Sequence, residues 1–285
     1  MQLNEIKKIG VVGAGTMGSG IAQMCALAGY ETILFDIDPR MLPRAMVAIE
    51  GSLAEAVKRN KLTTDAANVA LSRIYTTNLF ADLQADVFIE AIVENIDIKL
   101  EVFEQIAQNN APNCILASNT SSIPITRLAA KLHNPERVVG MHFFNPAHLM
   151  RLVEVIATSS TSAQVLETVR QLAEKMGKVP VTANDAPGFI VNRVARHYYV
   201  EALQLLEEGV ADHQTIDTLL ESCGFKMGPF KLMDLIGVDV NFSVTKSMFD
   251  SFHYVPRFRP SRIQQQKVEA GYHGRKTGKG FYEYE

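Results

Sequence analysis

The sequence predicts an α/β protein, with a doubly wound parallel sheet over residues 1–183 and an all-helical domain over residues 184–285. In the first part, short apolar runs alternate with helical patterns, as they do in the strand–helix units of a parallel sheet. In the second part, apolar residues recur at helical spacing only. The segment 184–188, Asn-Asp-Ala-Pro-Gly, is rich in turn formers and marks the boundary.

The composition is that of a globular protein. The 285 residues are 47% hydrophobic and 21% charged, with a net charge of −3. Without a basic excess, we expect no nucleic-acid partner. We also expect no membrane segment and no signal peptide, because no apolar run is long enough and the first strand begins close to the N-terminus. Three widely spaced cysteines predict reduced, core-packed thiols in a cytoplasmic protein.

Individual elements follow from the spacing of apolar residues and from turn formers. Strands are expected at 9–12, 32–35, 74–77, 87–91, 114–117, 137–142, 152–157 and 178–182. Helices of the first part are expected up to Gly29 and at 39–60, 64–72, 97–109, 123–131 and 163–176. In the second part, helices are expected at 188–208, from the cap Asp212 to before Gly224, from Gly228 with a break at Gly237, and after Pro260.

A glycine-rich turn directly follows the first strand, and its sequence is Gly13-Ala-Gly15-Thr16-Met17-Gly18. Gly13 permits the tight turn, Gly15 lets backbone amides approach a pyrophosphate, and Gly18 lets the helix lie close to the strand. The start of that helix then faces the phosphate charge. Asp36 ends the next strand, where a carboxylate accepts hydrogen bonds from a ribose and repels the 2′-phosphate of NADP. The combination predicts a Rossmann-like domain that binds NAD.

A histidine and a glutamate are the candidate catalytic pair. His142 lies at the end of the strand 137–142, at the sheet edge where open α/β proteins bind ligands. Glu154 lies in the otherwise apolar strand 152–157, and a lone carboxylate is costly to bury unless it is paired. The strand–loop–strand connection can bring it beside His142, which would then accept a hydroxyl proton as hydride leaves the neighbouring carbon. A purely structural pair is the alternative.

One polar loop at the same edge is Ser-Asn-Thr-Ser-Ser at residues 118–122. Ser121 or Ser122 can cap the helix that follows. Alternatively, the loop places a hydroxyl against a substrate oxygen. From the residues alone, capping is the preferred interpretation.

A second polar loop covers residues 94–99 and follows the strand 87–91. Asp97 is the expected N-cap of the next helix. Glu94 and Lys99 are candidates for contact with the ribose of a nicotinamide. Here too the residues alone favour capping.

Several longer motifs extend over essentially the whole chain. They are GAGTMGSGIAQ at 13–23, EAIVENIDIK at 90–99, SNTSS at 118–122, HFFNP at 142–146, LVEV at 152–155, PGFIVNR at 187–193, MGPF at 227–230 and GRKTGKGFY at 274–282. Together they resemble the 3-hydroxyacyl-CoA dehydrogenase family, in particular its short monofunctional type, the 3-hydroxybutyryl-CoA dehydrogenases. Several of the motifs are specific to that family.

The resemblance implies reversible oxidation of a short-chain (S)-3-hydroxyacyl-CoA to the 3-oxoacyl-CoA, with hydride passing to NAD. It implies that His142 is the general base and that Glu154 orients it. It also implies that Ser121 and Asn192 position the 3-oxygen and the thioester of the substrate. Beyond the glycine-rich turn, the implied NAD contacts are Asp36, Glu94, Lys99 and Asn119.

The CoA nucleotide is implied to meet Ser52 and Arg59. The basic cluster of Lys58, Arg59 and Lys61 suits a 3′-phosphate, although a solvated helix end shows the same residues. The family resemblance also implies a homodimer formed largely through the helical domain. We expect no metal, because the seven histidines show no metal-ligand spacing.

The segment after Asn192 departs from family members that act on plain short acyl chains. Asn192, Arg196 and Tyr199 share one helix face. Arg196 therefore either binds the terminal carboxylate of a dicarboxylic acyl chain or forms a salt bridge between domains or subunits. The segments 192–196 and 256–261 also resemble the 3-hydroxyadipyl-CoA dehydrogenases. His148 stands where the family often has proline, which bears on the shape of the pocket.

Two functions of other kinds are compatible with an NAD-binding domain. One is a non-catalytic NAD-binding or structural relative, against which the intact His142, Glu154, Ser121 and Asn192 argue. The other is a dehydrogenase of free 3-hydroxy acids. Such enzymes commonly rely on a catalytic lysine in the helical domain, which the pair of His142 and Glu154 fits poorly.

Overall fold

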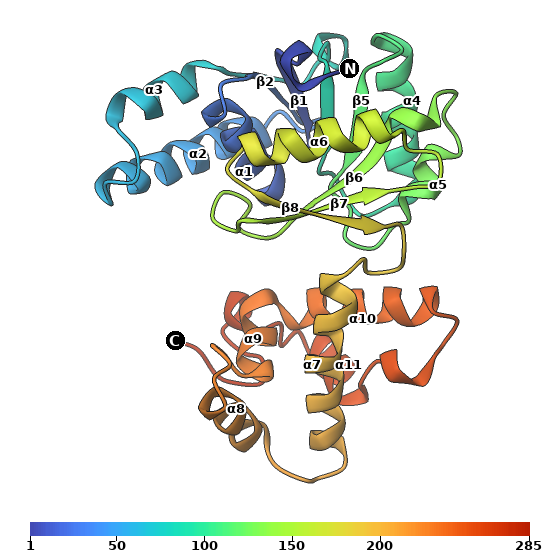
Figure 1. Ribbon diagram of the computed structural model, residues 1–285. Helices are drawn as coiled ribbons and strands as arrows, with labels where there is room; N and C mark the ends of the chain where they lie inside the picture. Colours follow the sequence, from blue (N-terminus) through green and yellow to red (C-terminus); the bar gives the residue numbers. More distant parts are fainter. The chain divides into compact units, whose positions relative to one another are not determined.

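The computed structural model describes residues 1–285 and divides into two compact units, Met1–Ala186 and Pro187–Glu285 (Figure 1). A sheet covered by helices forms the first unit and helices alone form the second, which is the class of fold that the sequence predicted. The division falls after Ala186 rather than after residue 183, because the last strand continues to Asn184.

Eight strands form one sheet, in the order β3-β2-β1-β4-β5-β6-β7-β8. They are β1 Lys8–Val12, β2 Glu31–Phe35, β3 Ile74–Thr77, β4 Val87–Glu90, β5 Ile115–Ser118, β6 Val138–Phe143, β7 Leu152–Ala157 and β8 Val179–Asn184. Neighbouring strands from β3 to β6 are parallel, β7 is antiparallel to β6, and β8 is parallel to β7. The carboxyl ends of β1, β4, β5 and β6 therefore share one edge with the beginning of β7.

Helices pack on the sheet of the first unit. They are α1 Thr16–Leu27, α2 Met41–Lys58, α3 Thr64–Ser72, α4 Ile96–Asn109, α5 Ile125–Ala129 and α6 Ala163–Lys175. α1 and α6 lie in front of the sheet in Figure 1 and share one hydrophobic core with its strands. α2 and α3 pack on α1 at the outer side of the unit.

The second unit is built from α7 Val191–Glu207, α8 His213–Ser222, α9 Pro229–Ile236, α10 Val238–Ser251 and α11 Arg262–Glu269. Its core contains the buried side chains of Leu203, Phe230 and Met233. Two buried aspartates fasten the backbone: Asp217 accepts a hydrogen bond from the Phe230 N–H, and Asp234 accepts one from the Phe281 N–H, both at 2.9 Å. No helix of the protein is both long enough and apolar enough to cross a membrane.

Of the N-caps predicted for α8 and α4 from the local sequence, the first is confirmed and the second is wrong. Asp212 caps α8 as expected, because its carboxylate accepts the Thr215 N–H at 2.7 Å. The prediction that Asp97 caps α4 was wrong. Asn95 is the cap, and its side-chain oxygen accepts the N–H groups of Asp97 and Ile98.

The predicted capping of α5 by Ser121 or Ser122 was also wrong. α5 begins only at Ile125, and the N–H groups of Ile125 and Thr126 donate to the carboxylate of Asp185. This acceptor lies about sixty residues further along the chain, so no local pattern reveals it.

The cysteines divide into two buried and one exposed. Cys25 and Cys114 are buried as expected, and burial raises the pKa of both thiols, that of Cys114 to about 12. The prediction that Cys223 packs in the core was wrong. It follows the last residue of α8 as the C-cap, where the chain leaves the helix, and its side chain is exposed.

Candidate active site

The glycine-rich turn joins β1 to α1, and its three glycines have different surroundings. Gly13 has a φ of +104°, and a Cβ there would lie 2.6 Å from the Ala91 carbonyl oxygen. A Cβ on Gly18 would overlap the Gly13 carbonyl oxygen, so the protein's own packing requires both glycines. A Cβ on Gly15 would meet no atom within 4 Å. The space in front of Gly15, at the start of α1, is what the close approach of a pyrophosphate needs.

Asp36 is held rigidly beside this turn. Its Oδ2 accepts the Ala14 N–H at 2.7 Å, and its Oδ1 accepts the Asp38 N–H at 2.9 Å. The first turn of α1 lies next to it, with Thr16 exposed and Met17 packed against the core. Each carboxylate oxygen has a further lone pair, so Asp36 can also accept hydrogen bonds from a ribose.

Arg40, which was not predicted from the sequence as a site residue, bears on the choice between NAD and NADP. Its guanidinium donates to both oxygens of Asp38, from Nε at 2.9 Å and from Nη2 at 2.8 Å. These hydrogen bonds lower the pKa of Asp38 to about 2. Two carboxylates, Asp36 and Asp38, thus follow β2, and the nearby arginine is already bound to one of them. This arrangement opposes a 2′-phosphate and fits NAD.

A cavity of about 540 Å³ adjoins Gly15 and Asp36. Its lining is mainly apolar and includes Ile37 and Val93, whose residues are 85% and 62% exposed. Exposed apolar side chains around a cavity favour a flat apolar group such as adenine. The residues present therefore fit NAD, whose nicotinamide accepts a hydride when it is bound.

His142 and Glu154 lie directly opposite each other in the antiparallel pair of β6 and β7. The Nδ1 of His142 is 2.8 Å from Oε2 of Glu154, and the two residues are only 5% and 1% exposed. The register brings them together, because opposite residues of antiparallel strands project to the same face. When Nδ1–H donates to the carboxylate, the neutral ring presents Nε2 as its acceptor nitrogen. This is the arrangement that a histidine general base needs.

Asn119 connects the neighbouring loop to this pair. Its Oδ1 accepts the Phe143 N–H at 2.8 Å, so the loop after β5 is tied to the end of β6 beside His142. The ring of Phe144 packs against the imidazole of His142 in a tilted arrangement, with 4.5 Å between the ring centroids and 53° between the ring planes. The oxygen of Asn119, a predicted NAD contact, thus has an internal partner.

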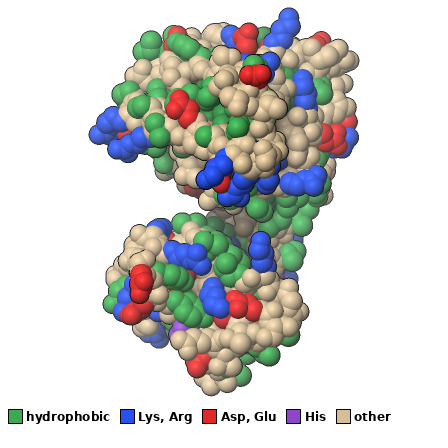
Figure 2. All heavy atoms as spheres, turned by 90° about the vertical axis from the view of Figure 1, so that its left-hand side faces the viewer, with side chains coloured by type: hydrophobic (Ala, Val, Ile, Leu, Met, Phe, Trp, Pro, Cys, Tyr) green, Lys and Arg blue, Asp and Glu red, His purple; other side chains and the backbone are tan.

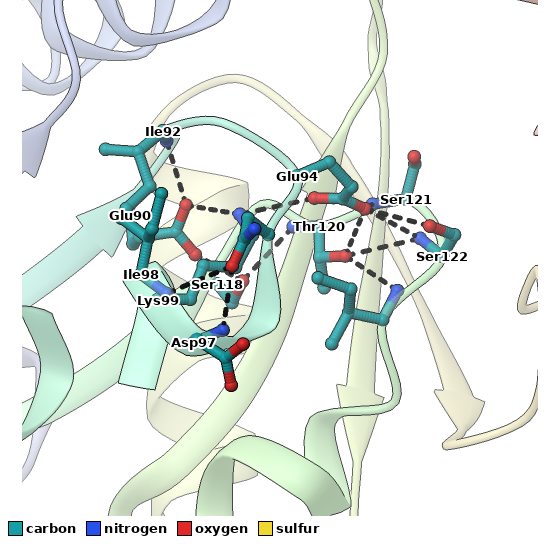
Figure 3. A network of polar contacts seen from close by, with 12 residues as sticks. Glu90, Ile92, Glu94, Asp97, Ile98, Lys99, Ser118, Thr120, Ser121 and Ser122 are labelled. Atoms are coloured by element: carbon teal, nitrogen blue, oxygen red, sulfur yellow. Dashed lines mark hydrogen bonds and ion pairs between the residues drawn. The ribbon is translucent and has the colours of Figure 1, made fainter. Parts of the chain in front are cut away.

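A buried lysine holds the two polar loops together (Figure 3). Lys99 lies in the first turn of α4, and its Nζ is 2.5 Å from Oε1 of Glu90 and 3.3 Å from Oε2 of Glu94. Glu90 ends β4 and is fully buried, and its other oxygen accepts the Ser118 hydroxyl at 2.6 Å. The Lys99 ammonium, which the resemblance assigned to NAD, thus lies between two carboxylates of the protein.

Glu94 organises the loop that carries Ser121. Its Oε1 accepts the Thr120 hydroxyl at 2.5 Å and the N–H groups of Ser121 and Ser122 at 3.1 and 3.2 Å (Figure 3). Burial opposes the ionisation of Glu94. The positive charge of Lys99 and the hydrogen bonds from the Thr120 and Ser122 hydroxyl groups outweigh burial, so the pKa of Glu94 is lowered. The ionised carboxylate therefore fixes the position of Ser121.

The residues predicted to meet CoA lie on α2. Ser52 is half-buried within the helix, and Arg59 is its C-cap. The Arg59 guanidinium forms an exposed ion pair with Glu55 at 2.6 Å. Asn192, predicted to position substrate, lies in the first turn of α7 in the second unit.

Arg196 is buried within the second unit without a carboxylate partner. Its Nη1 donates to the Asn241 carbonyl oxygen at 3.0 Å and to the Thr245 hydroxyl at 2.8 Å, whereas its buried Nε has no partner. Burial lowers the pKa of Arg196 to about 10. These partners are neutral groups of α10, which differs from the salt bridge that was one of the two predicted alternatives.

Glu90 and Ser118 were not predicted from the sequence as site residues, although a signal was available for Glu90. It is a lone carboxylate in an apolar strand, and the argument that required a partner for Glu154 applies equally to it. No group of three or more His, Cys, Asp or Glu side chains in the protein is arranged to hold a metal ion.

Family models of known proteins match almost the whole chain. Residues 8–186 match the model described as 3-hydroxyacyl-CoA dehydrogenase, NAD binding domain, and residues 188–284 match its C-terminal domain. The chain belongs to the 3-hydroxyacyl-CoA dehydrogenase family. Its first unit is the NAD-binding domain of that family. The chain is an NAD-dependent oxidoreductase that acts on 3-hydroxyacyl-CoA.

Several relatives are similar over the full chain. A 3-hydroxyadipyl-CoA dehydrogenase of Escherichia coli is 46% identical over 100% of this chain, which spans only 60% of that protein's length. A probable 3-hydroxybutyryl-CoA dehydrogenase of Deinococcus radiodurans is 43% identical over 97% of this chain and 100% of its own. The solved structure of an (S)-3-hydroxybutyryl-CoA dehydrogenase of Ralstonia eutropha has a TM-score of 0.94 and 40% identity, covering 99% of this chain and 100% of that one.

We predict that alanine at Gly15 and at Gly18 separates cofactor binding from folding. Gly15→Ala should leave the Tm nearly unchanged, because the added Cβ meets no protein atom, but should raise the Kd for NADH about tenfold or more by obstructing the pyrophosphate. Gly18→Ala should lower the Tm by about 5 °C or more, because its Cβ overlaps the backbone. Calorimetry and NADH fluorescence measure the two effects. Unchanged NADH binding in Gly15→Ala would contradict a pyrophosphate at this turn.

Proposed function

We propose that the protein reversibly oxidises a short-chain (S)-3-hydroxyacyl-CoA, such as 3-hydroxybutyryl-CoA, to the 3-oxoacyl-CoA. The observation that carries the proposal is the buried pair of His142 and Glu154 at the edge of the sheet that also carries the glycine-rich turn. The names of two relatives, a 3-hydroxybutyryl-CoA dehydrogenase from each of two bacteria, support the short acyl chain.

His142 is the general base in this proposal. Nε2 takes the proton of the 3-hydroxyl group while the hydrogen on C3 leaves as hydride, so that a carbon–oxygen double bond forms. The imidazolium that results donates Nδ1–H to the Glu154 carboxylate at 2.8 Å, which stabilises its positive charge. In the opposite direction, the imidazolium returns its proton to the oxygen of the 3-oxo group.

Other side chains bind and orient in this proposal. Ser121 and Asn192 position the 3-oxygen and the thioester, and the contacts of Glu94 support a fixed place for Ser121. Asp36 binds the adenosine ribose, and Asn119 lies nearer the nicotinamide. Glu94 and Lys99 act on NAD mainly by holding the loop. Ser52 and Arg59 meet the CoA nucleotide.

We further propose a cytoplasmic homodimer that forms through the second unit. The large apolar side chains of Val194, Leu219 and Phe225 are exposed on α7 and α8 and just beyond α8, as is typical of a protein interface. The three cysteines are free, which supports a reducing compartment.

Arg196 favours a second candidate substrate, 3-hydroxyadipyl-CoA. It lies one helical turn after Asn192 on the same face of α7, and its buried guanidinium has no carboxylate partner in the chain. A dicarboxylic acyl chain would supply that carboxylate. The 46% identity with the 3-hydroxyadipyl-CoA dehydrogenase of Escherichia coli supports the same substrate.

The experiment that tests the function follows NADH consumption with acetoacetyl-CoA and with 3-oxoadipyl-CoA. The short-chain proposal predicts a higher kcat/KM for acetoacetyl-CoA, and the second candidate predicts at least about a tenfold preference for 3-oxoadipyl-CoA. If the protein turns over neither thioester, both proposed substrates are contradicted and a non-catalytic NAD-binding protein is favoured. Free acetoacetate is the control for an enzyme that does not need CoA.

We predict that His142→Gln lowers kcat about a thousandfold, because no side chain then accepts the hydroxyl proton. Glu154→Gln should lower it about a hundredfold, since the imidazolium loses its ionic partner. The double variant should be no slower than His142→Gln, because the two groups act as one unit. The Kd for NADH should be the same in all three variants. A full kcat in His142→Gln would reduce the pair to a structural role.

If 3-hydroxyadipyl-CoA is the substrate, we predict that Arg196→Met lowers kcat/KM at least about tenfold for 3-oxoadipyl-CoA and changes it little for acetoacetyl-CoA. Calorimetry is needed alongside, because the variant also loses the hydrogen bonds to Asn241 and Thr245. Equal losses with both substrates, together with a lower Tm, would show that Arg196 serves only the packing of the second unit.

A further inference from the structure

The loop from β6 to β7, residues 144–151, connects the two members of the candidate catalytic pair. β6 carries His142 and ends one residue later, and β7, which carries Glu154, begins directly after the loop. The first residue of the loop is Phe144, whose ring packs against the imidazole of His142. The position of this loop therefore bears directly on the surroundings of the proposed general base.

Lys178 is a buried cation that holds this loop. Lys and Arg side chains are visible at the surface of the first unit in Figure 2, whereas Lys178 is only 8% exposed. Its Nζ donates to the carbonyl oxygens of Ala147 at 2.5 Å and of Met150 at 2.7 Å, and both of these residues belong to the loop. Burial lowers the pKa of Lys178 to about 8. The two charge-assisted hydrogen bonds offset part of the cost of burying the ammonium.

The strand register explains why Lys178 meets this loop. β8 pairs in parallel with β7, and Val179 lies opposite Leu152. The Val179 N–H donates to the carbonyl oxygen of Arg151, the last residue of the loop, at 2.8 Å. Gly177, with a φ of +75°, turns the chain between the end of α6 and Lys178. The start of β8 thus brings the lysine next to the loop.

The same loop packs against α1. Ala147 is 1% exposed and belongs to the hydrophobic core that α1 shares with the sheet. A Cβ on Gly20 of α1 would lie 3.1 Å from the Cβ of Ala147, so helix and loop are in close contact at this point. α1 begins at Thr16, within the glycine-rich turn that fits the pyrophosphate of NAD. Ala147 therefore contacts this helix through its side chain and Lys178 through its carbonyl oxygen.

We propose that Lys178 is a positioning residue for the oxidation of the 3-hydroxyl group, because it holds the loop from β6 to β7 against α1 and thereby fixes the imidazole of His142 relative to the NAD site. The proposal rests on the proposed function. A general base acts only when its nitrogen is within hydrogen-bond reach of the hydroxyl group while C3 faces the nicotinamide. α1 bears on the place of the dinucleotide and the loop bears on that of the imidazole. The contacts of Ala147 with Gly20 and Lys178 join the two.

The test measures NADH oxidation in a single turnover, so that product release does not mask the chemical step. The substrate is acetoacetyl-CoA or 3-oxoadipyl-CoA, whichever thioester the wild type turns over faster. Lys178→Met should lower the single-turnover rate about tenfold or more, because the loop loses both hydrogen bonds and the imidazole loses its fixed place. The KM for the thioester and the Kd for NADH should stay within about twofold, because Lys178 is not a proposed ligand contact.

Gly20→Ala reaches the same contact from the side of α1. Its Cβ would push Ala147 by a few tenths of an ångström and should lower the single-turnover rate about threefold. In the double variant the released loop accommodates the added Cβ, so the rate should be no lower than in Lys178→Met. If Lys178→Met does not fold, Gly20→Ala decides alone, and an unchanged rate in it would overturn the proposal.

Arg137→Met is the matched control. Arg137 is also a buried cation, and its Nη1 donates to the carbonyl oxygens of Ala111 and Pro112. It directly precedes β6, at the end of that strand remote from His142. The control should therefore leave the single-turnover rate unchanged. Equal losses of rate in Lys178→Met and Arg137→Met, or a change in KM or in the Kd for NADH without a change in rate, would overturn the positioning role.

Proton NMR of the His142 ring separates a failure of this inference from a failure of the proposed function. The Phe144 ring moves with the loop and lies 4.5 Å from the imidazole between ring centroids, so Lys178→Met should shift the His142 Hε1 signal and Arg137→Met should not. The loss of the signal in His142→Gln assigns it. If the wild type turns over neither thioester, the proposed function fails, and a shifted signal still supports the positioning of the imidazole by Lys178. An unshifted signal would overturn it.

Discussion

The edge of the sheet that carries the candidate active site depends on one interaction, the buried ion pair that the Lys99 ammonium forms with Glu90. It joins the end of β4 to the start of α4 and, through Glu90 and Glu94, to the loop after β5. Without it, the fully buried carboxylate of Glu90 would have no ionic partner, which is strongly unfavourable. The Lys99 charge favours the ionised form of Glu94, which is the stronger acceptor for the N–H groups of Ser121 and Ser122, so the position of that loop also depends on Lys99.

Buried cations serve two purposes in this protein, and the presence of a carboxylate distinguishes them. Lys99 is fully paired, and its role is to fix backbone at the sheet edge. Lys178 and Arg196 are also buried, but they donate to carbonyl or hydroxyl oxygens and keep an unneutralised charge. A charge that the protein desolvates and does not neutralise is available to an anionic ligand. The proposed contact of Arg196 with the terminal carboxylate of a dicarboxylic acyl chain rests on this difference.

The parts of the site that the sequence predicted are those governed by local spacing or by one strong physical constraint. The glycine-rich turn and Asp36 follow from the geometry of one strand–helix–strand unit, and the meeting of His142 with Glu154 follows from the cost of a lone buried carboxylate. The contacts that it did not predict are between distant segments. Asp185, which follows α5 by about sixty residues in the sequence, accepts the N–H group at the start of that helix. Lys178 donates to a carbonyl oxygen of the loop from β6 to β7. Such partners depend on the folded arrangement and leave no pattern in the neighbouring residues.

The most direct test of the role of Lys99 is a double-mutant cycle with Lys99→Met and Glu90→Gln, measured as the free energy of unfolding in urea. Each single variant should lose about 3–5 kcal/mol, because each leaves an uncompensated charge or an unmatched polar group in the interior. The double variant should lose at least about 1 kcal/mol less than the sum of the single losses. Additive losses would contradict the account, since they would mean that the buried ion pair does not organise this edge of the sheet.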